Sequence, residues 1–202
     1  MAAVNESIVR EYFELHGFLV HQYRKYVAPA GREDDDLDFF VFNPRPQTGT
    51  EETQFVLGAA SLPSIERALV VIKAWHTETF TPAALNNAPE LFRFLKQKAF
   101  QKAVRDFGQE GHLRKILVVP ALPQDTQSRD QSIAIFRANG IDAVISFRTM
   151  LTELVAKVER NRNYQKSDLL QTLRILKNYD LLKEPQLELF KPHRKSSKAS
   201  KR

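Results

Sequence analysis

Residues 68–75 read ALVVIKAW, a nearly continuous apolar run of strand length. A strand that is apolar on both of its faces is typical of a sheet whose two sides are covered by helices. The run therefore predicts a buried central strand. Its one charged residue, Lys73, carries an ammonium group that needs a carboxylate, a phosphate or water as a partner.

The segments before this strand predict a helix, two further strands and a long loop. They cover, in order, residues 4–16, 18–27, 37–43 and 44–67. Gly17 closes the helix as a left-handed C-cap, and the two strands are rich in aromatic and branched side chains. The loop is rich in Pro, Gly, Thr and Ser, with a short strand near its middle as an option.

Helices and strands alternate after the central strand. Helices are predicted over residues 89–107, 128–138 and 149–161 and from residue 167 onward, and strands over residues 115–120 and 141–147. Helices between strands favour an α/β protein with a central mixed sheet flanked by helices. The chain then divides into an α/β domain at residues 1–161, a C-terminal helical extension at residues 162–190 and a tail at residues 191–202.

Composition excludes several classes of protein. The absence of cysteine excludes disulfides, thiolate zinc sites and cysteine nucleophiles. No run approaches the ~18 apolar residues that span a bilayer, and the N-terminus lacks the pattern of a secretory signal. We therefore expect a cytoplasmic protein with no membrane partner.

The net charge of +6 originates in the tail. Residues 191–202 hold six of the 30 basic residues and no acidic residue, and the rest of the chain has 24 of each sign. The pI near 9.5 therefore describes the tail rather than the folded part. The tail predicts salt-sensitive contacts with nucleic acid, through Arg194, Lys195 and Lys198.

Lys73 and a few carboxylates are the candidates for chemistry. Asp38 stands at the start of the second predicted strand, with Asp36 two residues earlier and on the same face. If the second and third strands form a hairpin, Asp38 and Lys73 lie on neighbouring strands. Glu6 shares a helical stripe with apolar residues, so it points toward the core side of the first helix.

Each candidate has an ordinary structural alternative. Lys73 can extend from a strand end into water, Asp38 can be a solvated turn residue, and Glu6 can complement the dipole of its helix. His76 and the basic side chains of the helix at residues 89–107 could contact phosphates, although a solvated surface is the simpler interpretation.

These residues and the order of elements resemble the PD-(D/E)XK nuclease superfamily, and within it the resolvase-like and restriction-endonuclease-like members. That family has an α-β-β-β-α-β core, with an acid on the first helix, an Asp at the start of the second strand and an acid-x-Lys motif on the third. The segments NESIVREYFELHGFLV, DLDFFVF and VVIKAWH correspond to these parts. The resemblance covers most of the chain, residues 4–160.

The resemblance implies hydrolysis of phosphodiester bonds in DNA with Mg²⁺ or Mn²⁺ as the cofactor. It assigns catalytic roles to Lys73, Asp38 and Glu6, and metal ligation to Asp38, Glu6 and Asp36. One position departs from the pattern, because Val71 stands where the acid-x-Lys motif has its acid. The centre is then incomplete or remodelled.

Three classes of function stay open at this point. The first is a metal-dependent DNA endonuclease, and the second is a catalytically inactive nuclease-fold module that binds nucleic acid or a protein partner. In the third, the leucine-rich C-terminal helix is a docking or homodimer surface. Glu66 or Glu78, near the two ends of the central strand, could substitute for the missing acid in the first class.

Overall fold

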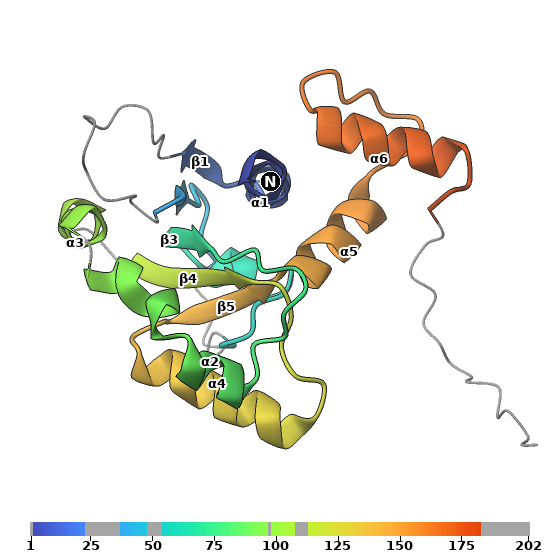
Figure 1. The fold of residues 1–202 in the computed structure, drawn as a ribbon. Helices are drawn as coiled ribbons and strands as arrows, with labels where there is room; N and C mark the ends of the chain where they lie inside the picture. The colour runs from blue at the N-terminus through green and yellow to red at the C-terminus, as the bar shows by residue number, and fades with distance from the viewer. Residues whose placement is uncertain (1, 23–36, 48–53, 97, 108–112, 183–202) are drawn as a thin grey trace, which may run out of the picture.

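The computed structural model describes residues 2–22, 37–47, 54–96, 98–107 and 113–182 (Figure 1). Five strands form one sheet in the order β1-β2-β3-β4-β5. They are β1 (Leu19–Gln22), β2 (Phe39–Phe42), β3 (Arg67–Ile72), β4 (Leu113–Val119) and β5 (Ala143–Ser146). β2 pairs antiparallel with both β1 and β3, whereas β3, β4 and β5 run parallel. The sheet is therefore mixed, as predicted.

Helices flank this sheet and provide its crossover connections. In chain order they are α1 (Ala2–Leu15), the 3₁₀ turn η2 (Leu62–Ser64), α2 (Pro82–Asn87), the 3₁₀ helix η3 (Pro89–Lys96), α3 (Lys98–Phe107), α4 (Thr126–Ala138), α5 (Phe147–Lys157) and α6 (Asp168–Asn178). α2, η3 and α3 lie between β3 and β4, and α4 lies between β4 and β5. The predicted α/β class is confirmed.

Each face of the sheet buries its own hydrophobic core. The first core contains Val70 of β3 and apolar residues of α1, α5 and α6. The second core contains Leu69 and Val71 of β3 and apolar residues of α2, η3, α3 and α4. Figure 1 shows α1 on one side of the sheet and α2 and α4 on the other. β3 is therefore buried on both faces, as its apolar sequence predicts.

Single residues in the sequence determine where some of the helices end or begin. Gly17 has φ +84°, which confirms the predicted left-handed cap after α1. The helix predicted over residues 149–161 spans Phe147–Lys157 instead, and Ser146 caps it by accepting a hydrogen bond from the Thr149 N–H at 3.0 Å. The central strand ends at Ile72 rather than at Trp75.

The region predicted as one long helix over residues 89–107 differs most from expectation. It consists of η3 and α3, with the additional short helix α2 before it. Pro82 and Pro89 open α2 and η3, positions at which a proline has no N–H to lose from the helix. The optional strand near residue 55 is a single parallel bridge, Val56 to Val144, at the outer edge of β5.

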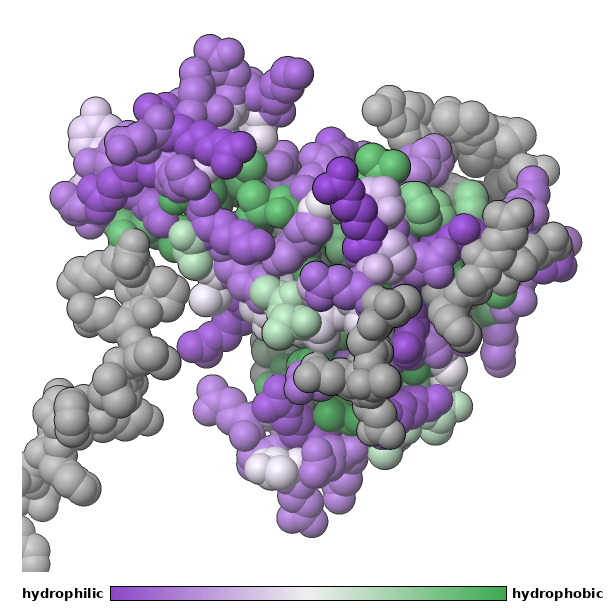
Figure 2. Space-filling view, turned by 180° about the vertical axis from the view of Figure 1, so that it is seen from behind, coloured by the Kyte–Doolittle hydropathy of each residue, from purple (hydrophilic) through white to green (hydrophobic). Residues whose placement is uncertain are grey.

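No helix in the described part of the chain is long and apolar enough to cross a membrane. Seen from behind, the surface is mostly hydrophilic, with apolar side chains in smaller patches between (Figure 2).

We expect Leu117→Ala to lower the free energy of unfolding by about 2–5 kcal/mol, since it removes a fully buried side chain of β4 from the second core. Leu19→Ala, on the edge strand β1 where the side chain is 62% exposed, is the matched control and should change little. Urea unfolding of both variants measures the difference. Equal losses would contradict the burial of Leu117 in the second core.

Candidate functional site

The candidate residues gather at the edge where the parallel strands end. β3, β4 and β5 share this carboxyl edge because they run in the same direction, and β2, which runs the opposite way, begins there. In open α/β sheets this edge is where ligands usually bind. Asp38 immediately precedes β2, and Lys73 immediately follows β3.

The side chain of Asp38 continues the pairing of β2 with β3. Phe39 pairs with Val70, so Asp38 lies opposite Val71. The Asp38 N–H donates to the Val70 carbonyl oxygen at 3.3 Å, and the Ile72 N–H donates to Asp38 Oδ2 at 2.7 Å. The carboxylate thus takes the place that a backbone carbonyl of a longer β2 would occupy. Asp38 is half-buried and bonded, which argues against a solvated turn residue.

Lys73 directs its ammonium group toward η3. Its N–H donates to the Val118 carbonyl oxygen at 3.0 Å, which extends the pairing of β3 with β4. Its Nζ lies 5.7 Å from the centroid of the Phe94 ring, in a cation–π contact. Phe94 belongs to the second core, the side of the sheet that Val71 also faces. Lys73 and the residue pair Asp38–Val71 therefore share one face.

Glu6 lies near the same edge but on the other face. Gln22, the last residue of β1, donates from Nε2 to Glu6 Oε2 at 2.6 Å, and Arg10 donates to Gln22 Oε1. Gln22 pairs with Phe39, whose side chain enters the first core under α1. The fold therefore brings Asp38 and Lys73 together and places the Glu6 carboxylate across the sheet from the Lys73 ammonium.

A complete carboxylate centre is not formed by the described residues. Among them, no group of three or more His, Asp or Glu side chains could hold a metal ion. Val71, at the position of the missing acid, is 1% exposed and packs in the second core. These residues do not fit a Mg²⁺ or Mn²⁺ ion bound by three protein ligands. Asp36, Arg194, Lys195 and Lys198 lie outside the described residues.

A histidine and an asparagine join the elements at this edge. His76 Nε2 donates to Asn5 Oδ1 at 2.8 Å, and the His76 ring meets Phe147 edge-on, with 4.7 Å between centroids. Asn5 is buried while His76 is exposed. The place of His76 after the central strand made it a candidate, but nothing in the pattern of α1 indicates Asn5 as its partner.

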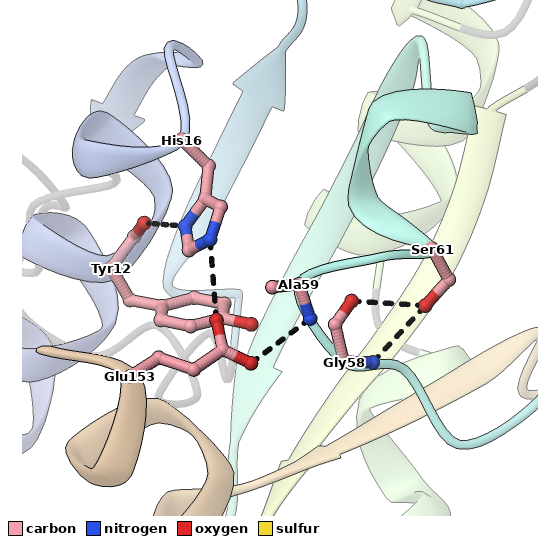
Figure 3. Close-up of polar contacts among 6 residues, drawn as sticks. All are labelled: Tyr12, His16, Gly58, Ala59, Ser61 and Glu153. Carbon is pink, nitrogen blue, oxygen red and sulfur yellow. Dashed lines mark hydrogen bonds and ion pairs between the residues drawn. The ribbon is translucent and has the colours of Figure 1, made fainter. Parts of the chain in front are cut away.

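A second cluster of titratable side chains lies between α1, α5 and the loop before η2 (Figure 3). Glu153 Oε1 accepts a hydrogen bond from the Ala59 N–H at 2.9 Å, and its Oε2 lies 3.2 Å from His16 Nε2. His16 Nδ1 donates to the Tyr12 carbonyl oxygen at 2.7 Å. Ser61 forms hydrogen bonds with Gly58, and Ala59 separates it from His16 (Figure 3). The cluster therefore fixes the loop before η2 and does not activate Ser61 as a nucleophile.

Burial governs the protonation of this cluster. It raises the pKa of the Tyr12 hydroxyl well above its ordinary value, and the adjacent Glu153 carboxylate adds to the effect. It lowers the pKa of His16, an effect that the Tyr12 carbonyl and Glu153 oppose. Sequence spacing could link Tyr12 with His16, one turn later on α1, but not with the distant Glu153.

We expect Glu153→Ala to lower the free energy of unfolding by about 1–3 kcal/mol, because the Ala59 N–H loses its acceptor and the buried His16 loses its partner. Thr152→Ala, at the neighbouring exposed position of α5, is the control. Chemical denaturation of both variants measures the change. A loss no larger than that of the control would contradict a structural role for the carboxylate.

The raised pKa of the Tyr12 hydroxyl leads us to expect that the stability of the fold declines at alkaline pH. Its pKa is higher in the folded than in the unfolded chain, so the unfolded state releases the proton first and stability falls as pH rises above about 10. Tyr12→Phe should remove the part of this loss of stability that comes from the hydroxyl. The measurement is the unfolding midpoint of the variant and of wild type at about pH 8 and at about pH 11. The exposed Tyr179→Phe is the control and should decline like wild type.

Comparison with known proteins adds no relative: no family, curated protein or solved structure significantly matches the chain.

Proposed function

We propose that the chain is a DNA-binding protein built on a nuclease-like core whose centre lacks a complete set of catalytic groups. The observation that carries this proposal is the burial of Val71. It lies opposite Asp38 and two residues before Lys73, where the resemblance implies an acid, and it packs in the second core. A carboxylate that held a metal would have to leave that apolar surrounding.

The order of elements supports the nuclease-like core. α1, β1, β2 and β3, then the helical crossover through α3, then β4 follow the α-β-β-β-α-β order that the resemblance implies. Asp38 and Lys73 stand at the ends of β2 and β3 that the resemblance assigns to them. The order of the elements and the positions of these two residues in the sheet both support the proposal.

A second candidate is a working endonuclease with a remodelled centre. The observation that favours it is the shared face of Asp38 and Lys73 on neighbouring strands. Magnesium often uses one or two carboxylates together with water and phosphate oxygens, so a smaller set of protein ligands does not exclude it. The Lys73 ammonium would then stabilise negative charge that develops on a phosphate.

Nicking of supercoiled plasmid in the presence of Mg²⁺ or Mn²⁺ separates the two candidates. We expect the wild-type chain to retard the plasmid on a gel without nicking it. If it does nick, Asp38→Asn and Lys73→Met should each reduce the rate at least about tenfold, as expected when a group that stabilises the transition state is lost. The Asn side chain keeps an oxygen for the Ile72 N–H while removing the charge.

Two control variants test whether a contaminating nuclease or misfolding causes the observed nicking or its loss. Asp130→Asn and Lys166→Met change exposed residues of the same types and should leave any nicking unchanged. Metal-dependent nicking by the wild type that both site variants abolish would overturn the first proposal and establish the second. Nicking that survives both would exclude this centre. Val71→Glu, checked for folding by circular dichroism, tests whether one carboxylate restores cleavage.

A further inference from the structure

η3 and α3 expose a row of cationic side chains beside the candidate site. We call it the basic stripe: Arg93, Lys96, Lys98, Lys102 and Arg105, all exposed. The first two lie three residues apart in a 3₁₀ helix, where such residues stand above one another. The other three follow at spacings of four and three on α3, which places them on one face of an α-helix.

The apolar sides of the same two helices fix the direction of the stripe. Leu91 and Phe94 of η3, and Phe100 and Ala103 of α3, are buried in the second core. The cationic side chains lie on the opposite, solvent-facing side. Figure 1 shows α3 at the periphery of the fold, to the left of the sheet. The stripe is therefore held in place by packing that does not involve its charges.

The charges of the stripe are not neutralised within the described part of the chain. None of the five forms an ion pair with a described residue, and Glu90 and Asp106 are the two acidic residues on the same helices, against these five cations. Lys98 and Lys102 are four residues apart, and like charges at this spacing destabilise a helix by a few tenths of a kcal/mol. Contact with water accounts for the exposure of these cations, and a polyanionic partner would in addition relieve their mutual repulsion.

The stripe begins at the candidate site. The Lys73 ammonium lies over Phe94, which stands between Arg93 and Lys96 on η3. From Lys98 to Arg105 the helix rises about 10 Å, a length along which one strand of duplex DNA presents about three phosphates. A backbone that follows the stripe toward η3 would therefore reach the carboxyl edge at Lys73.

We propose that the basic stripe binds the phosphate backbone of duplex DNA and directs it toward the carboxyl edge of the sheet. This inference rests on the proposed function, from which it takes DNA as the partner. A membrane surface fits less well, because interfacial helices add exposed aromatic and aliphatic residues to their cations and here those residues are buried in the second core.

The test compares charge-matched variants of the full chain by fluorescence anisotropy with a labelled duplex of about 20 bp, between 50 and 200 mM salt. The stripe variant carries Lys98→Gln, Lys102→Gln and Arg105→Gln. The control variant has the same net charge and carries Arg129→Gln, Arg162→Gln and Lys166→Gln at exposed positions on other elements. Both keep the C-terminal tail, so its contribution cancels in the comparison.

We expect the stripe variant to bind on the order of ten- to a hundredfold more weakly, and the slope of log K against log salt to become about three units shallower. The control should stay within about threefold of wild type. Equal affinity and slope for the stripe variant and wild type would overturn the inference while leaving DNA binding intact. Poly-glutamate that competes as well as DNA would also overturn it, in favour of an acidic protein partner.

A failure of the inference about the basic stripe can be distinguished from a failure of the proposed function. A wild-type chain that binds no DNA at low salt would refute the proposed function itself. Binding that depends on the stripe supports the inference whether or not the chain cleaves.

Discussion

The side chains of β3 alternate between two separate cores, with Val70 in the first and Val71 in the second. A strand without a solvent-facing side needs a layer of helices on each face, and its parallel pairing with β4 needs a crossover along one of them. α1 and α5 cover one face, and the segment from α2 to α3 covers the other together with α4 and provides the crossover. The carboxyl edge, with the candidate residues, follows from this arrangement.

The same constraint explains the state of the candidate centre. Position 71 faces the second core, where Phe80 and Phe94 are also buried. A carboxylate there would be desolvated unless a cation or a metal compensated it, whereas valine completes the packing. The absence of a carboxylate at position 71 and the continuity of the second core therefore have the same cause, the valine side chain. Lys73 lies one step further along the same face, at the end of the strand, where its ammonium reaches an aromatic ring.

The sequence predicts what depends on local pattern. The apolar run around Val70 predicted a two-sided central strand, and Gly17 predicted the end of the first helix, because burial and positive φ both leave a direct signature. The break between η3 and α3 was not predicted, since residues 90–107 contain no Gly or Pro that would signal the end of a helix.

The site shows the same division between local and distant contacts. The neighbouring positions of Asp38 and Lys73 follow from the order of the strands. The bond from the Ile72 N–H to Asp38 and the contact of Glu153 with His16 join distant parts of the chain through side chains. No periodicity in one sequence encodes such pairs. The Glu6 carboxylate was placed on the core side of α1 correctly, but α1 covers the face opposite to Lys73.

Retention of Asp38 and Lys73 does not by itself indicate catalysis, because each has a role in the folded chain. Asp38 supplies the acceptor that β3 lacks where β2 stops, and Lys73 is stabilised by the face of Phe94. The basic stripe differs in this respect: its five cations have no ion-pair partner among the described residues and repel one another along two helices. Removing those charges would not weaken the cores beneath them. A feature that folding does not require is the better indicator of a partner, so the surface of η3 and α3 supports the proposed DNA partner more strongly than the centre does.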